Sequence, residues 1–250
     1  MTISRLLSIP VLAALIAMSA SAAEPAAAQG QPRVLYDRAH GENEPVAALT
    51  ALAARLGFEL ATATTPITPA SLAGVRVLYL RAPSTAITAE EKAAIIAFVR
   101  AGGSLLLVMD ENTRQDIGVV GANDLIEPFG LRLTGDTPYL HNTGAIAKAG
   151  AIHAADREVP YSGGRAVEGG DAFAYQLDKD GKPAQPFAAS KALPNGARIV
   201  VLAEGMASLF LGRPEGQRLT GPPRDAQNTV YWGKDSAIFM QEIVAWLATR

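Results

Sequence analysis

Polar and charged residues follow several apolar runs of this sequence, and their types suit binding chemistry. They are Asp37, His40, Glu42, Arg81, Ser84, Asp110, Glu111, Glu204 and Ser208. An ionised carboxylate accepts several hydrogen bonds, so this set can bind a hydroxyl-rich ligand. Carboxylate oxygens also bind hard cations such as calcium or magnesium. We therefore take these residues as the candidate ligand-binding set.

Two of the carboxylates also suggest acid–base chemistry. A pair such as Asp37 and Asp110 can serve in glycosidic hydrolysis when the two are correctly spaced and one is protonated. Nothing in the sequence sets their separation or raises the pKa of either. A structural alternative is that Asp37 caps a turn or a helix while His40 packs on its loop. We assign no residue to catalysis from the sequence.

The patterns of zinc enzymes and serine hydrolases are missing. The histidines at positions 40, 141 and 153 lack HExxH or related spacing. A zinc site needs three or four converging ligands, so neither a resident metal nor a cofactor is expected. The serines at positions 84, 104 and 208 do not lie in a Gly-x-Ser-x-Gly elbow.

Parallel strands would bring the candidate residues to one edge of a sheet. Short apolar runs predict strands at residues 33–36, 58–63, 75–80, 104–108 and 198–203. Helical patterns begin near Asn43 and at Thr88, and the connections are short. The alternation predicts an α/β fold with an open, mostly parallel, flavodoxin-like sheet flanked by helices. Open sheets of this kind bind ligands at the carboxyl ends of their strands.

The clearest folding unit is a helix followed by a strand. Thr88 and Glu91 have the spacing of a capping box, which predicts the start of the helix. Gly102 and Gly103 predict its end, because glycine readily adopts the left-handed conformation. The next five residues, Ser104–Val108, are apolar without alternation, which predicts a strand buried on both faces.

The second half of the chain differs in texture. A short helix is predicted at residues 122–129. Residues 131–194 are rich in glycine, proline and polar residues, and residues 172–177 alternate in polarity, which predicts an antiparallel β-rich insertion or extension. Residues 212–233 have the composition of a long Gly/Pro-rich loop, and residues 235–248 predict a C-terminal helix.

Composition narrows the function classes. Hydrophobic residues make up 49% of the 250 residues and charged residues 18%, which predicts a substantial core. The formal net charge is -2 without a basic run, which argues against nucleic acid as a partner. The sequence has no cysteine, so disulfides, thiolate metal sites and a cysteine nucleophile are excluded.

The N-terminus has the pattern of a secretory signal. Arg5 supplies a positive charge, an apolar stretch follows at residues 6–18, and small residues follow at 20–22 and 26–28. We expect a signal peptide at residues 1–28, a domain at 31–250, and a periplasmic or secreted protein without stable membrane insertion after cleavage. The alternative is that the segment stays in place as an N-terminal anchor.

The motifs in their order resemble a known superfamily. VLYDRAHGE, ITAEEKAAIIAFVRAGGSLLLVMDE, NDLIEPFGLRL, GARIVVLAEGMASLF and FMQEIVAWLA follow one another along the chain. The sequence resembles the class I glutamine amidotransferase-like superfamily. Within it, the chain is most similar to the non-catalytic GIFT-type branch, which occurs in gliding-motility ABC-transporter accessory proteins and intraflagellar-transport proteins.

This resemblance implies the fold and the loss of the reaction. The enzymes of the superfamily have a cysteine nucleophile after the strand that corresponds to Ser104–Val108, and here Met109, Asp110 and Glu111 follow it. Their later His-x-Glu pair corresponds to Leu202-Ala203-Glu204, so the glutamate is present and the histidine is not. The chain is therefore expected to be non-catalytic.

Three functions remain open at this point. The first is an exported non-catalytic domain that binds a small polar ligand, such as a carbohydrate, or a cell-envelope protein. The second is a carboxylate-based hydrolase of the glycosidase kind, with or without a metal. The third is an interaction scaffold that uses residues 131–194 and 212–234 as its partner surface.

Overall fold

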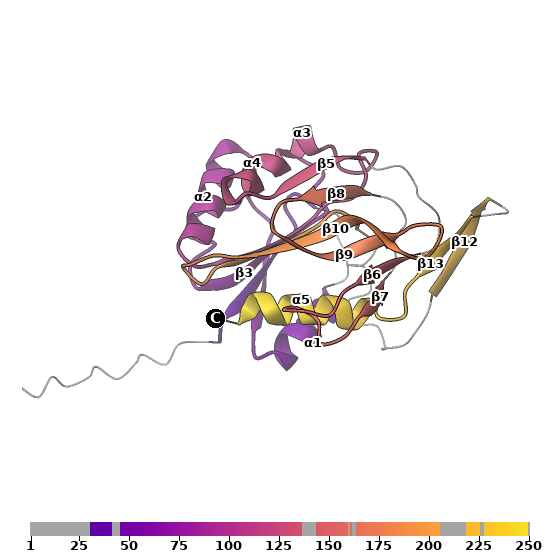
Figure 1. The fold of residues 1–250 in the computed structure, drawn as a ribbon. Coiled ribbons are helices and arrows are strands. Elements are labelled where there is room, and N and C mark those ends of the chain that lie inside the picture. Colours follow the sequence, from indigo (N-terminus) through magenta and orange to yellow (C-terminus); the bar gives the residue numbers. More distant parts are fainter. Residues whose placement is uncertain are drawn as a thin grey trace, which may run out of the picture. The chain divides into compact units, whose positions relative to one another are not determined.

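A nine-stranded sheet with the strand order β2-β1-β3-β4-β11-β10-β9-β6-β7 organises the protein (Figure 1). The computed structural model describes residues 31–41, 46–136, 144–159, 161, 164–205, 219–225 and 228–249. The predicted signal segment lies outside these residues. The division into a signal peptide at 1–28 and a domain at 31–250 therefore stays a prediction.

The first part of the sheet is parallel, as predicted. Its strands are β2 (Glu59–Ala63), β1 (Arg33–Asp37), β3 (Val75–Arg81), β4 (Ser104–Val108) and β11 (Arg198–Leu202). All four neighbouring pairs among them are parallel. With β11 as the fifth strand, this is the flavodoxin-like order 2-1-3-4-5. The predicted fold class is confirmed.

The second part of the sheet is antiparallel and continues from β11. It consists of β10 (Pro183–Ala192), β9 (Asp171–Leu177), β6 (Ala145–Ala147) and β7 (Arg157–Val159). A separate antiparallel pair is formed by β5 (Arg132–Asp136) and β8 (Arg165–Glu168). The region at 131–194 thus contributes strands to the main sheet and a small second sheet.

Helices cover both faces of the main sheet. In Figure 1, α1 (Ala47–Arg55) and α5 (Ser236–Ala248) lie on one face, and α2 (Ala89–Arg100), α3 (Ile117–Val120) and α4 (Ala122–Ile126) lie on the other. The described part of α1 begins at Ala47, and the predicted start near Asn43 lies outside the described residues. Among the described residues, no helix has the length and hydropathy needed to span a bilayer.

The predicted helix–strand unit is confirmed in its details. The Thr88 hydroxyl accepts a hydrogen bond from the Glu91 N–H, and the Glu91 carboxylate accepts one from the Thr88 N–H, so the capping box is complete. Gly102 ends the helix with a φ of 103°. A Cβ atom on Gly103 would lie 2.2 Å from the Phe98 ring, so only glycine fits there without displacing that ring. All five residues of β4 are buried.

Some predictions about local structure were wrong. The short helix α3 was not predicted; the Asp116 side chain starts it by accepting hydrogen bonds from the N–H groups of Gly118 and Val119. The helix predicted at 122–129 is α4 followed by a 3₁₀ turn, Glu127–Phe129. Pro128 explains the change, because it cannot donate the hydrogen bond that continues an α-helix.

The region at 212–233 is not a loop throughout. It contains β12 (Leu219–Asp225) and β13 (Asn228–Trp232), which pair antiparallel. The register between them shifts between Thr220 and Pro223, where Pro222 and Pro223 supply no N–H to the ladder. The Gly/Pro content that indicated a loop therefore belongs in part to an irregular hairpin.

Candidate functional site

Four charged residues are buried where the parallel strands end. Asp37 ends β1 and is 1% exposed, Arg81 ends β3 and is 3% exposed, Asp110 follows β4 and is 5% exposed, and Glu204 follows β11 and is 0% exposed. Burying a charge is costly unless it is paired and hydrogen-bonded. The stability of these four buried side chains therefore depends on the groups that contact them.

The first group of partners is a chain of three side chains, Asp37, His40 and Glu91. His40 Nδ1 lies 3.0 Å from Asp37 Oδ2, and His40 Nε2 lies 3.2 Å from Glu91 Oε1. Asp37 Oδ1 also accepts a hydrogen bond of 2.9 Å from the Ala39 N–H, so Asp37 caps the turn after β1. Glu91, expected only as a capping residue of α2, is thus also a partner of the candidate site.

The pKa values of His40 and Glu91 favour their charged forms. The hydrogen bond from His40 to Asp37 raises the pKa of His40 above its ordinary value, against the opposing effect of burial, and Glu91 adds to the increase. Burial raises the pKa of the Glu91 carboxyl, but hydrogen bonds from the N–H groups of Thr88 and Ile67 outweigh it. The net pKa of Glu91 is lowered, so the carboxylate is ionised near neutral pH.

The turns after β1 and β3 are joined through their backbones. The Ser84 N–H donates a hydrogen bond of 2.7 Å to the His40 carbonyl. Gly41 pairs with Pro83 in an isolated β-bridge, and a Cβ atom on Gly41 would lie 2.3 Å from the Arg81 carbonyl oxygen. Ala82 has a φ of 46°, in the left-handed region that alanine rarely adopts. These contacts hold the two turns side by side.

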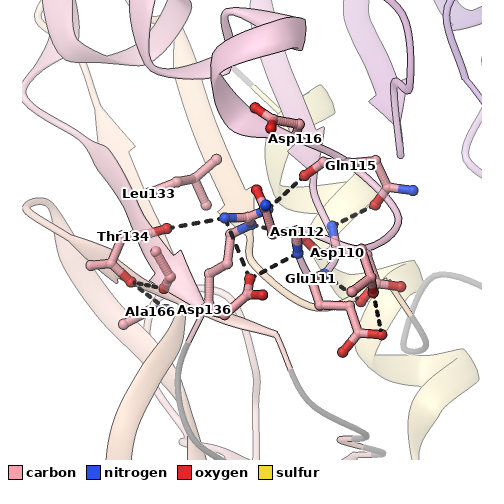
Figure 2. Close-up of polar contacts among 12 residues, drawn as sticks. Asp110, Glu111, Asn112, Gln115, Asp116, Leu133, Thr134, Asp136 and Ala166 are labelled. Carbon is pink, nitrogen blue, oxygen red and sulfur yellow. Dashed lines mark hydrogen bonds and ion pairs between the residues drawn. The ribbon is translucent and has the colours of Figure 1, made fainter.

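The turn after β4 is ordered by its own side chains. Met109 is fully buried, and its N–H donates to the Leu202 carbonyl at 2.8 Å, so it continues the pairing between β4 and β11. The Asp110 N–H donates to Gln115 Oε1, and Asp110 Oδ1 accepts a hydrogen bond of 2.8 Å from the Glu111 N–H. Figure 2 shows these contacts around Asp110 and Gln115.

Arg165 of β8 reaches this turn from the antiparallel region. Its Nε donates to the Asp110 carbonyl at 2.8 Å, and its Nη2 donates to the Gln115 carbonyl at 2.6 Å and to Asn112 Oδ1 at 3.2 Å. Its Nη1 lies 3.5 Å from Asp136 Oδ1, and Asp136 in turn accepts a hydrogen bond from the Asn112 N–H (Figure 2). Arg165 is 1% exposed and is the central cation of this turn.

Charges surround the Arg165 guanidinium. Burial lowers its pKa below the ordinary value, and the carboxylates of Asp136, Asp116, Asp110 and Glu111 act in the opposite direction. An arginine side chain stays protonated in proteins, so it acts as a permanent counter-charge here. The sequence offered one weak signal for this residue, the glycine at position 164 just before it. The structure explains this glycine, because a Cβ atom there would lie 2.2 Å from the Ala203 carbonyl oxygen.

The exits of β4 and β11 also lie in contact. A Cβ atom on Gly205 would lie 2.7 Å from Asp110 Oδ2, so glycine at this position lets the Asp110 carboxylate approach the chain after β11. Asp110 Oδ2 also lies 3.7 Å from Arg114 Nη1. Glu204 is fully buried next to this contact. The Asp110 carboxylate is therefore enclosed by the turn that follows each strand.

The structure separates the predicted residues into two groups. Asp37 and His40 contact each other and, through the backbone, Ser84. Asp110 and Glu111 contact each other and the Arg165 network, and Glu111 also accepts a hydrogen bond from the Thr113 hydroxyl. Glu42 and Ser208 lie outside the described residues. Whether any of the predicted residues binds a ligand stays a prediction.

The side chains at the carboxyl edge also determine whether it can hold a cation. Within the described ranges, no group of three or more His, Cys, Asp or Glu side chains is arranged to hold a metal ion. Asp37 and Glu91 lie on opposite sides of the His40 ring, and each carboxylate already accepts hydrogen bonds from the protein. The described residues at the edge therefore resemble an internally paired network more than a cation cage.

A second histidine network lies on the α5 side of the sheet and was not predicted. His153 Nδ1 lies 2.8 Å from Glu242 Oε2, and the Arg157 guanidinium donates two hydrogen bonds to the same carboxylate. The His153 ring stacks on Phe239 at a centroid distance of 5.1 Å. Burial lowers the pKa of His153 below its ordinary value. This network fastens α5 to the chain between β6 and β7.

Comparisons with known proteins bear on the fold. No family model matches the sequence, and no curated protein matches it. The structure is similar to the mmIFT52 N-terminal domain, with a TM-score of 0.54 and 17% identity over 70% of this chain and 87% of that one. It is also similar to a GMP synthase-like protein from Thermoplasma acidophilum, with a TM-score of 0.50 and 12% identity over 87% and 94% of the two chains. At these identities the likeness is one of fold alone.

Proposed function

We propose that this chain is an exported, non-catalytic domain that binds a small polar ligand, such as a carbohydrate, at the carboxyl edge of its parallel sheet. The observation that carries the proposal is the buried group of charges at that edge, formed by Asp37, Arg81, Asp110 and Glu204. Burying a charge is costly, so four buried charges at one edge mark that edge as a candidate site. The carboxyl edge is also the ligand-binding edge of open α/β sheets.

The turn after β4 supports the non-catalytic part of the proposal. In the enzymes that the sequence resembles, this turn holds the cysteine nucleophile. Here Met109 is buried in the pairing between β4 and β11, and Asp110 is held by Gln115 and the Glu111 N–H. The position of the catalytic histidine is Leu202, which is fully buried inside β11. The inherited acyl-transfer reaction therefore has neither its nucleophile nor its base.

The geometry of Asp37 weighs against the hydrolase alternative. A glycosidase needs one carboxylic acid that is free to protonate the leaving group. The Asp37 carboxylate is 1% exposed and is bound by His40 and the Ala39 N–H, so its oxygens are already used. Binding is thus the better-supported function of the same edge.

Export rests on the N-terminal pattern alone. The positive residue, apolar stretch and small residues of the first 28 positions are those of a signal peptide. An exported domain without cysteines has no disulfide to stabilise it, so its core must do so. N-terminal sequencing of the protein recovered from the periplasm and medium of expressing cells tests this part. Recovery of an uncleaved chain from the membrane fraction would contradict it.

A thermal-shift screen tests the binding part. The purified protein is melted with mono- and oligosaccharides and, separately, with divalent cations. A ligand at 100 times its Kd adds about 2.7 kcal/mol of stability, and for a chain of this size that corresponds to roughly 5–11 °C in Tm. The variant Asp110→Asn keeps an oxygen for the Glu111 N–H but removes the charge, so it should lose the shift. If no ligand raises the Tm, the binding proposal is wrong.

A matched control separates site effects from general charge effects. Asp124 lies on α4 with a side chain that is 66% exposed and paired with Lys92. Asp124→Asn removes the same charge away from the edge, so it should keep the full ligand shift. Release of reducing sugar from any oligosaccharide in the screen would instead support the hydrolase and overturn the non-catalytic assignment.

A further inference from the structure

The ring of His40 lies between two carboxylates at the carboxyl edge. Asp37 at the end of β1 contacts Nδ1, and Glu91 in the first turn of α2 contacts Nε2. The His40 residue is 7% exposed, and the side chains of Asp37 and Glu91 are 1% and 3% exposed. The ring therefore joins the turn after β1 to α2 in a site that is largely shielded from water. Glu91 lies 51 positions after His40 in the sequence.

The two carboxylate partners require the His40 ring to be protonated on both nitrogens. An ionised carboxylate only accepts, and a neutral imidazole donates from one nitrogen alone. A neutral His40 would direct the lone pair of its other nitrogen at a carboxylate oxygen. The imidazolium form donates from both nitrogens and satisfies both partners. Charge-assisted hydrogen bonds of this kind are also stronger than neutral ones.

We propose that His40 is a proton-operated latch, which in its protonated form ties the turn after β1 to the N-terminus of α2 through Glu91 and on deprotonation loses that contact. Among the described residues, the charges that act on His40 from the elements packed against it are Asp37 from β1 and Glu91 from α2, and both favour the proton. The turn after β3 contacts His40 through the Ser84 N–H and the His40 carbonyl, which do not titrate.

The contact to Glu91 is the one that opens. The Glu91 carboxylate accepts three further hydrogen bonds, from the Ile67 N–H at 2.7 Å and from the N–H and hydroxyl of Thr88, both at 3.0 Å. Among the described contacts of Asp37, the Ala39 N–H is the other donor. Asp37 thus has the greater need of a donor, so the neutral ring keeps its remaining proton on Nδ1. Nε2 then presents a lone pair to Glu91 Oε1, and the two separate.

The direction of the pH effect follows from these contacts. The folded protein raises the pKa of His40 above 6.5. The closed form is therefore favoured at low pH, and the latch opens as the pH rises through the folded-state pKa of His40. Its effect on ligand binding rests on the proposed function: binding at the edge would weaken on the alkaline side, where His40 no longer contacts Glu91. The latch itself needs no ligand to be observed.

Histidine NMR tests the latch directly. The chain has three histidines, so ¹⁵N-histidine labelling gives three ring systems in a pH titration of the full chain. The signal that disappears in His40→Gln is assigned to His40. We expect both its nitrogens to be protonated at the acidic end of the titration, a midpoint above 6.5, and a Nδ1–H tautomer at high pH. The backbone amide signals of Ile67 and Thr88 should shift with the same midpoint, because Glu91 accepts from both.

A conservative variant controls for folding. Glu91→Gln keeps the capping box, since glutamine is the other residue found at this position of the motif. It removes one of the two charges at the ring, so the His40 midpoint should fall while the Thr88 cap persists. A wild-type midpoint at or below 6.5, an unchanged midpoint in Glu91→Gln, or amides of Ile67 and Thr88 that do not follow His40 would each overturn the latch. A failed ligand screen with a normal titration would instead overturn only the proposed function.

Discussion

Replacing Arg165 with methionine is the strongest test of how the carboxyl edge is held together. The substitution keeps an apolar side chain of similar length in β8 and removes the guanidinium. Asp110 and Gln115 then keep their carbonyl groups in a buried position without the donor that Arg165 supplied. We expect the turn after β4 to lose its fixed conformation and the protein to lose stability.

The size of the loss follows from the contacts. The two shortest hydrogen bonds of Arg165 are those to the carbonyls of Asp110 and Gln115, at 2.8 and 2.6 Å. Removing one partner of a buried charged network typically costs about 3–5 kcal/mol, because the groups left behind stay buried without a partner. Arg165 is 1% exposed, so water cannot replace its donors without a rearrangement. We therefore expect a loss of about 3–5 kcal/mol in the free energy of unfolding.

Urea denaturation followed by circular dichroism measures this loss. Thermal melting gives a second readout, and a loss of this size lowers the Tm by roughly 6–20 °C. Arg165→Lys keeps the charge but lacks the fork of donors, so its stability should lie between those of the wild type and Arg165→Met. Arg132→Met is the control: its side chain is 61% exposed and 3.6 Å from Glu127, so its loss should stay within about 0.5 kcal/mol.

Two outcomes would refute this reasoning. A loss below about 1 kcal/mol for Arg165→Met would mean that the buried carbonyls find other partners at little cost. A stability of Arg165→Lys equal to that of Arg165→Met would mean that the charge contributes nothing. The first outcome would mean that the turn after β4 is held without Arg165, and the second that the donor geometry of the guanidinium acts without help from its charge.

Other predictions concern the rest of the fold. Arg76 donates to the carbonyls of Gly102 and Thr249, each at 2.7 Å, where the chain leaves α2 and α5. Arg76→Met should therefore lower the free energy of unfolding, measured in urea, by about 2–4 kcal/mol. A loss under 1 kcal/mol would contradict this prediction. Gly103→Ala places a methyl group against the Phe98 ring and should cost about 1–3 kcal/mol in the same assay, whereas a neutral result would show that the ring moves freely. Burial lowers the pKa of His153, so its contribution to folding stability is fully present above pH 6.5 and is lost as the pH falls through its folded-state pKa. Urea midpoints measured between pH 7 and 5 should therefore fall less steeply in His153→Phe than in the wild type. Equal slopes would refute this prediction.

Elements with strong local signals could be predicted from the sequence. The capping box of Thr88 and Glu91 and the buried strand Ser104–Val108 lie within a few residues of their own signals. The order of strands and helices then implied a parallel sheet, and the first five strands of the sheet are parallel. Where the local signal was mixed, as in the Gly/Pro-rich stretch that contains β12 and β13, the prediction was wrong.

The partners at the carboxyl edge could not be predicted in the same way. Parallel topology placed Asp37 and Asp110 at one edge, but it did not indicate that Glu91 would contact His40. Arg165 lies 55 residues beyond Asp110 and reaches it only because β8 packs beside the turn after β4. No spacing in the sequence encodes such a contact.

The sequence by itself thus determined the parallel sheet, the edge where charges gather and the absence of a cysteine nucleophile. These depend on residue type and on short-range pattern. Only the tertiary structure decided that His40 contacts the carboxylates of Asp37 and Glu91, and that Arg165 donates to the carbonyls of the turn after β4. The physical reason is that a buried charge is stabilised by whichever opposite charge the fold brings within a few ångströms, and chain crossings between distant segments make that choice.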